Sequence, residues 1–226
     1  MRKTIVATTL ALAAFSVGTE ARAAGWGLHS GDTLGAGDNM LYGEVGWPDF
    51  AVGFQHGMSQ RVDIGFRFGL TYGYDYTTGT QTGMTMKVPI RFAIAKNNRY
   101  SILFHFDPGL KFESFGDQDC VFHHHYCYND GRLAFGFALG LGLEFGFHVS
   151  REATVNFGVE APIYLNLTNG VYAGIPLLFG PGFEYDVDNH IALGFNTRFG
   201  PTLFPNDLTT DTRFALIAQA FFAYRL

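Results

Sequence analysis

The stretch "CVFHHHYC", residues 120 to 127, holds the side chains best suited to chemistry in this chain. Three histidines in a row lie between Cys120 and Cys127. Imidazoles and thiolates are ligands of zinc and copper, so a metal site is one interpretation. In an exported protein, however, two cysteines this close usually oxidise, and closing the eight-residue loop stabilises it by roughly 2.5 kcal/mol. We therefore expect a Cys120–Cys127 disulfide.

Oxidation would remove the thiolates as metal ligands and leave the imidazoles. In an extended backbone, His123 and His125 point the same way, and Asp117, Asp119 or Asp130 supplies a third ligand. This set is incomplete for a structural zinc site. His123 and His125 thus stay weak metal candidates, the alternatives being an exposed polar loop or a loop that gains charge near the ordinary histidine pKa of about 6.5. No cofactor is predicted.

A second pair, His105 and Asp107, lies two residues apart on one predicted strand and shares a face. A His beside an Asp can form half of a general-base pair. No nucleophile with a neighbouring acid is evident in the sequence, and His148 and His190 fall at the opposite rim. We therefore expect His105 to make structural hydrogen bonds, and we predict that the protein is not an enzyme.

The first 23 residues read as a secretory signal peptide. Arg2 and Lys3 precede a short apolar stretch, and an A-x-A cleavage site ends at Ala23. Residues 24–39 are then expected to form an N-terminal periplasmic segment. The net charge of -5, with no basic stripe, argues against a nucleic-acid partner.

The clearest structural signal is the run "LAFGFALGLGLEFGFHV", residues 133 to 149. Large apolar residues occupy every odd position, and small, charged or polar residues occupy every even one. A period of two places these sets on opposite faces of a long strand, whereas a helix would scatter both sets. The same rule recurs along the chain, with short and long connections in alternation.

Ten strands are predicted, with eight as the alternative count. Their ranges are 40–47, 50–58, 61–74, 83–95, 100–115, 132–148, 153–167, 171–185, 191–203 and 212–226. Prolines inside strands of a closed sheet normally sit at bulges, so we expect bulges or breaks at Pro89, Pro108, Pro162, Pro176 and Pro181.

The pattern fits an all-β, antiparallel, up-and-down transmembrane barrel over residues 40–226, with apolar side chains toward lipid and small or polar ones toward the lumen. A soluble barrel would need abundant charge outside, and only 15% of the residues are charged. The longest connection, which holds residues 120–127, would then lie outside the cell. Several tyrosines near strand ends suit interfacial girdles: Tyr72, Tyr74, Tyr100, Tyr164 and Tyr224.

On these features the chain resembles the bacterial outer-membrane β-barrel proteins, from about Met40 to the end. The segment "FALIAQAFFAYRL" is similar to their last strand, with Phe222, Tyr224 and Leu226 at alternate positions. The family usually ends in Phe or Trp, and Leu226 departs from that pattern. The resemblance implies location in the outer membrane, contact with its lipid, and insertion by the barrel-assembly machinery through this strand.

The inward set of the predicted barrel carries nearly balanced charges. We expect the following to line the lumen: Glu44, Arg67, Lys87, Arg91, His105, Asp107, Lys111, Glu113, Arg132, Glu144, Glu160, Glu184, Arg198 and Arg213. Inward glycines leave room for water, which favours a narrow porin-like channel for small hydrophilic solutes or ions. The alternatives are a closed barrel that acts through its external loops and, as a minor one, an outer-membrane enzyme.

Overall fold

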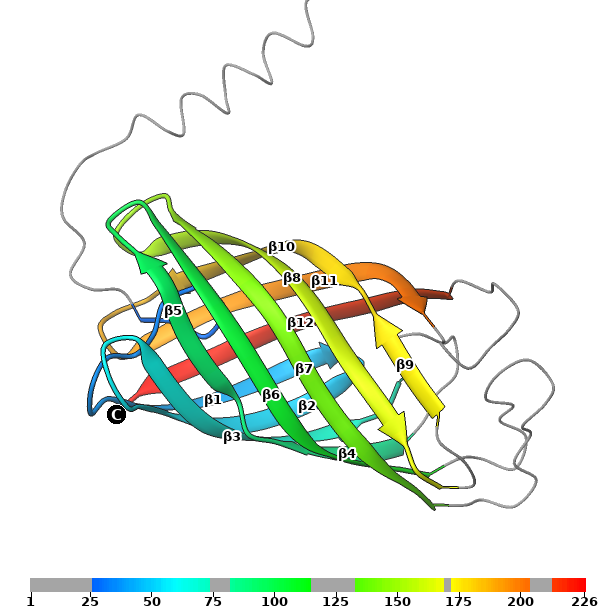
Figure 1. The fold of residues 1–226 in the computed structure, drawn as a ribbon. Helices are drawn as coiled ribbons and strands as arrows, with labels where there is room; N and C mark the ends of the chain where they lie inside the picture. The colour runs from blue at the N-terminus through cyan, green and yellow to red at the C-terminus, as the bar shows by residue number, and fades with distance from the viewer. Residues whose placement is uncertain (1–25, 74–81, 115–132, 169–171, 204–212) are drawn as a thin grey trace, which may run out of the picture.

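A computed structural model gives the fold, and it describes residues 26–73, 82–114, 133–168, 172–203 and 213–226. These residues are all-β and contain no helix (Figure 1). Across the described ranges, no helix has the length and apolar character needed to cross a membrane.

Twelve strands form one antiparallel sheet. Their bounds are β1 Asn39–Trp47, β2 Asp49–Gly57, β3 Val62–Thr71, β4 Thr82–Lys87, β5 Ile90–Lys96, β6 Tyr100–Ser114, β7 Leu133–His148, β8 Ala153–Asn166, β9 Tyr172–Pro176, β10 Leu178–Asp186, β11 Ile191–Leu203 and β12 Arg213–Arg225.

The twelve strands occupy ten positions around the wall of a closed barrel. Each such position is here called a stave. Strands β4 and β5 both pair with β3 and β6, and strands β9 and β10 both pair with β8 and β11, so each couple is one interrupted stave. The sheet closes where β1 pairs with β12, from Met40 opposite Arg225 to Trp47 opposite Ala218. The predicted ten-stranded antiparallel barrel is confirmed, and among the described strands closure leaves no sheet edge free to pair with another chain.

Two of the five prolines behave as predicted. The break between β4 and β5 contains Pro89, and the break between β9 and β10 follows Pro176. The expectation was wrong for Pro108, Pro162 and Pro181, which lie inside continuous strands and keep a Cα partner on the neighbouring strand. A proline removes only its own N–H from the ladder, so the rest of each strand stays paired.

The two faces of the barrel are divided by residue type. Along β7, exposed and buried positions alternate, with Leu133, Phe135 and Phe137 outside and Ala134 and Ala138 inside. The same alternation runs through β8 and β10. The apolar face therefore points outward and the small and polar face lines the lumen, as the period of two predicts.

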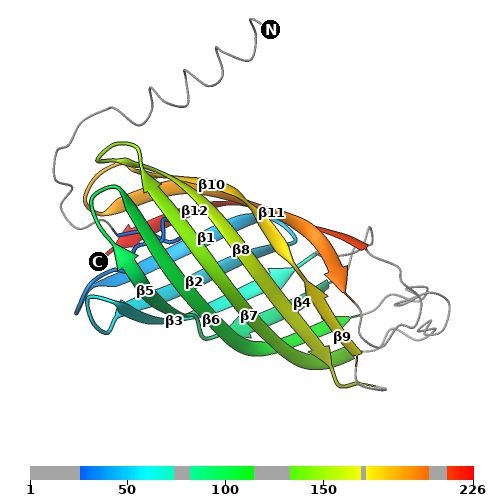
Figure 2. The same ribbon diagram turned by 45° about the horizontal axis from the view of Figure 1, so that its top comes forward.

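The barrel has two different ends (Figures 1 and 2). At one end, here called the turn end, tight turns join β2 to β3, β5 to β6, β7 to β8 and β10 to β11, and the C-terminus lies there too. The other end, the loop end, carries the connections that contain residues 74–81, 115–132, 169–171 and 204–212, which lie outside the described residues.

Residues 26–38 precede β1 at the turn end; residues 26–34 pack inside the barrel, and residues 35–38 connect them to β1. Trp26, Leu28 and Leu34 are buried, and they belong to a cluster with apolar side chains of β1, β11 and β12: Met40, Tyr42, Ala192, Phe221 and Ala223. Prediction treated 24–39 only as a periplasmic segment; the structure gives residues 26–38 a place within the fold, and we call them the plug.

The plug is held by polar contacts to strands on all sides of the lumen. On one side, Glu184 of β10 accepts hydrogen bonds from the backbone N–H groups of Leu28 and His29, each at 3.1 Å. On another, Arg91 of β5 donates to the carbonyl oxygens of Gly27 and Asp32, at 2.8 and 2.5 Å. Contacts to opposite walls show that the plug crosses the lumen.

Candidate functional site: a charged cavity in the lumen

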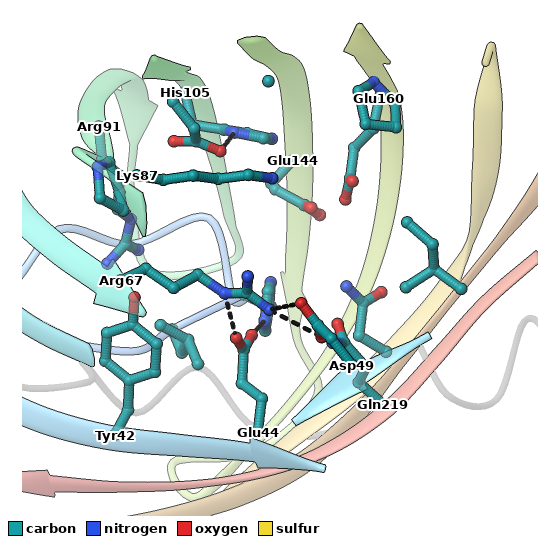
Figure 3. Close-up of a pocket in the computed structure, with 18 of the residues that line it drawn as sticks. Tyr42, Glu44, Asp49, Arg67, Lys87, Arg91, His105, Glu144, Glu160 and Gln219 are labelled. Carbon is teal, nitrogen blue, oxygen red and sulfur yellow. Dashed lines mark hydrogen bonds and ion pairs between the residues drawn. The ribbon is translucent and has the colours of Figure 1, made fainter. Parts of the chain in front are cut away.

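A cavity of about 140 Å³ lies in the lumen beside the plug (Figure 3). Leu28 and His29 of the plug form part of its wall, and the rest comes from β1 to β8, β11 and β12. The charged residues in its lining are Glu44, Asp49, Arg67, Lys87, Arg91, Asp107, Glu144 and Glu160. The cavity thus combines charged and apolar lining residues inside a barrel whose outer surface is apolar.

The first charge cluster in the wall centres on Arg67 of β3. Its Nε donates to Glu44 Oε2 at 2.6 Å, and its Nη2 lies 3.0 Å from both carboxylate oxygens of Asp49. Glu44 also contacts Nε2 of His29 at 3.2 Å, and Gln219 donates to Asp49. One guanidinium therefore holds two carboxylates from β1 and β2 and, through Glu44, a side chain of the plug (Figure 3).

The second cluster centres on Arg198 of β11, whose side chain is fully buried. Its Nη2 lies 2.7 Å from both oxygens of Glu144, and its Nε donates to Glu160 Oε1 at 3.1 Å. The guanidinium lies over Gly158, where any side chain would collide with it. A glycine at this position is therefore required by space, because a buried charge must reach its partners to offset desolvation.

His105 and Asp107 lie together as their spacing predicts. His105 Nδ1 is 2.8 Å from Asp107 Oδ2, and both side chains are largely buried in the cavity wall. This bond fixes the orientation of the ring. The ring extends over Gly142 of β7, whose missing side chain leaves the space that Nε2 occupies.

Most of the predicted lumen residues face inward. Eight line the cavity: Glu44, Arg67, Lys87, Arg91, His105, Asp107, Glu144 and Glu160. Four others are buried but are not part of its lining, namely Lys111, Glu113, Glu184 and Arg198. Lys111 pairs with Glu113, and its Nζ lies 4.0 Å from the centre of the Tyr164 ring. Tyr164 itself lines the cavity, so its assignment to an interfacial girdle was wrong.

Several predicted residues cannot be placed. Cys120, Cys127, His123, His125 and Arg132 lie outside the described residues. Arg213 begins β12 and has an interaction partner. At the C-terminus, Phe222, Tyr224 and Leu226 all point outward, as the alternation requires.

Sequence reasoning missed two lumen residues that matter here. Asp49 was assigned to a connection, yet it begins β2 and binds Arg67. His29 belongs to the plug, whose sequence has no strand period. Their contacts depend on the plug and on the register of β2, and neither is visible as a local pattern.

Comparison with known proteins gives no family for this chain: no family model matches it, and no curated protein has a similar sequence. The fold and the site define it as a closed ten-stranded β-barrel with a plugged, charge-lined lumen.

Proposed function

We propose that the protein is an integral outer-membrane β-barrel whose lumen is closed at the turn end by the plug. The observation that carries the membrane assignment is the outward surface. Large apolar side chains stand exposed on successive strands, from Leu41 and Val52 through Phe66 and Phe92 to Val159. In water such a continuous apolar surface would be heavily penalised, whereas lipid would cover it.

Aromatic side chains support the same assignment. Tyr100, Tyr185 and Tyr224 are exposed near the turn end, and Tyr72 is exposed near the loop end. Tyrosine prefers the interface between hydrocarbon and water, because its ring is apolar and its hydroxyl is polar. The tyrosines at the two ends of the barrel would therefore mark the two borders of the bilayer. Separately, residues 1–23 resemble a signal peptide, which would direct the chain to the cell envelope.

The plug favours a closed barrel over a freely open pore. It adds a buried apolar cluster and hydrogen bonds to the lumen wall, and the lumen charges beside it are paired with one another. Small barrels are usually filled in this way. In this view the connections at the loop end contact partners outside the cell, and the lumen charges hold the barrel together.

A narrow channel remains the second candidate, favoured by the small residues on the inward face of β7. Gly136, Gly140 and Gly142 contribute no side chain to the lumen, so displacement of the plug would leave space for water and ions. A barrel closed by the plug would not conduct while the plug is present, whereas a channel would conduct with the plug in place.

Conductance of purified protein in planar bilayers separates the two functions. We expect no discrete current steps from the full mature chain, and discrete steps from a variant that lacks residues 26–34. A matched deletion within residues 204–212, which connect β11 to β12, should stay silent. Steps of equal size from the full chain and from the plug deletion would contradict closure by the plug and would favour the channel.

A further inference from the structure

We propose that His105, Glu144 and Glu160 form a binding site for a divalent first-row metal cation such as Zn²⁺ inside the barrel. One ligand atom from each of these residues lies within 4.8 Å of the others. One imidazole and two carboxylates are donors that zinc accepts. The proposal concerns the lumen and does not depend on whether the barrel conducts.

The register of three neighbouring strands brings these side chains together. His105 of β6 is opposite Gly142 of β7, and Gly142 is opposite Glu160 of β8. Because Gly142 has no side chain, the ring of His105 lies above it and reaches toward β8. Glu144 follows Gly142 by two residues and therefore points into the same space (Figure 3).

The ring of His105 has the orientation expected of a metal-binding histidine. Its Nδ1 is bonded to Asp107 Oδ2 at 2.8 Å, which leaves Nε2 to face the site. A carboxylate on the far nitrogen of a ligating histidine fixes the ring and raises its basicity. Asp107 would therefore act as a positioning residue and not as a ligand.

The charged groups around the cavity have a net negative charge that a divalent cation would balance. Five carboxylates line it, from Glu44, Asp49, Asp107, Glu144 and Glu160. Three cationic groups lie beside them, those of Arg67, Lys87 and Arg198. Arg91 also lines the cavity, but Asp63 balances it at 3.5 Å. A ligating imidazole must be neutral, and with His105 neutral the count leaves two negative charges for the cation to balance.

An independent sign of a polar occupant is Asn196 of β11. Its side chain lines the cavity, the residue is only 3% exposed, and its Oδ1 has no hydrogen-bond partner within the parts of the chain that the structure describes. A buried acceptor without a partner is costly. A hydrated cation in the cavity would supply the missing donor through a bound water.

Arg198 is compatible with the metal. It binds Glu144 and Glu160 together and so keeps the two carboxylates adjacent despite their like charge. An ion ligated at the usual 2.0–2.2 Å needs donor atoms closer than 4.8 Å, so the three side chains would contract around it. Arg198 would then remain as a hydrogen-bond donor to the ligating carboxylates.

The test is Zn²⁺ binding by calorimetry on the folded mature chain in detergent, in a background where His123, His124 and His125 are all alanine. That background removes the competing loop imidazoles. We expect one Zn²⁺ per chain, a loss of at least tenfold in affinity for His105→Ala and for the isosteric Glu160→Gln, and a loss of ten- to a hundredfold for Asp107→Asn. The control His190→Ala, at the turn end, should bind as tightly as the background.

A second readout identifies the ligand directly. Cu²⁺ bound in place of Zn²⁺ should show hyperfine coupling to a single nitrogen in its electron paramagnetic resonance spectrum, and His105→Ala should abolish that coupling. The proposal is overturned if the background protein binds no Zn²⁺, which would mean that protons balance the cavity charge. It is equally overturned if binding persists unchanged in both His105→Ala and Glu160→Gln, which would reveal an adventitious ion only.

Discussion

At the scale of single residues, the lumen is organised by arginines that each hold two carboxylates. Arg67 joins Glu44 and Asp49, and Arg198 joins Glu144 and Glu160. The first set links the consecutive strands β1, β2 and β3, whereas the second links β7 and β8 to the distant strand β11. Such a charge, once buried, stabilises the fold only while all its partners remain, because an unpaired ion in a low-dielectric interior is heavily penalised.

Arg198→Met should therefore be strongly destabilising. It leaves Glu144 and Glu160 without their cation, and we expect the free energy of unfolding to fall by about 3–5 kcal/mol. Reversible urea unfolding from lipid vesicles measures this. The matched control is Arg225→Met, which breaks the partly exposed pair with Asp38 at the turn end and should cost at most about 1 kcal/mol. Equal losses for the two variants would contradict the role assigned to burial.

Sequence reasoning identified the inward charges but not their partners. Glu144, Glu160 and His105 each occupy an inward position by alternation alone. The three side chains meet because of the strand register, which places Gly142 of β7 opposite both His105 of β6 and Glu160 of β8. A shift of one residue would send every side chain to the other face, and a shift of two would separate the set. Register is a property of paired strands and cannot be read from one strand.

At the scale of elements, the strands were predictable and the plug was not. The ten predicted ranges agree with the observed staves to within three residues at each end. The plug sequence, by contrast, is held largely through backbone atoms: the N–H groups of Leu28, His29 and Leu34 and the carbonyl oxygens of Gly27 and Asp32. Every residue type has these atoms, so the side-chain pattern carries no signal for the contact.

A side chain placed where the plug passes should expel it. Any Cβ at Gly146 of β7 would collide with the carbonyl oxygen of Ser30 and with Ser101 Oγ. Gly146→Val should therefore expose residues 26–38 to added protease, with cleavage mapped by mass spectrometry. Gly43→Val is the matched control, because a Cβ there finds only the carbonyl oxygen of Ala51, at 3.9 Å. Protection of the plug in the Gly146 variant would show that it can be held elsewhere.

At the scale of the whole molecule, the barrel has the opposite distribution of apolar and polar side chains from a water-soluble barrel. Its apolar side chains are outside, and its buried set contains charged and polar residues such as Arg198, Glu184, Gln55 and Asn156. The sequence predicts this arrangement, because large apolar residues alternate with small or polar ones and only 15% of the residues are charged, too few to solvate the glycine-rich face in water. The connections at the loop end carry no such periodicity, and the disulfide predicted there stays a prediction.

Val159→Arg tests the membrane assignment. Val159 is 47% exposed near the middle of β8, and in the proposed bilayer a charge at this position would face hydrocarbon. We expect the free energy of unfolding in lipid vesicles to fall by about 2–4 kcal/mol, against about 0–1 kcal/mol for Val187→Arg in a turn at the barrel end. Equally small losses for the two variants would contradict the membrane assignment, since an arginine on the surface of a soluble barrel would stay in water without loss of stability.

The position of the plug also fixes an order of events in time. Residues 26–38 leave the ribosome before any strand does, yet the N–H of Leu28 bonds to Glu184, which is 156 positions later in the chain. The bond between Leu28 and Glu184 cannot form until eight of the ten staves exist, because β10 completes the eighth. Burial of the plug is therefore a late step of assembly, and a buried Leu28 reports that the barrel wall around it has formed.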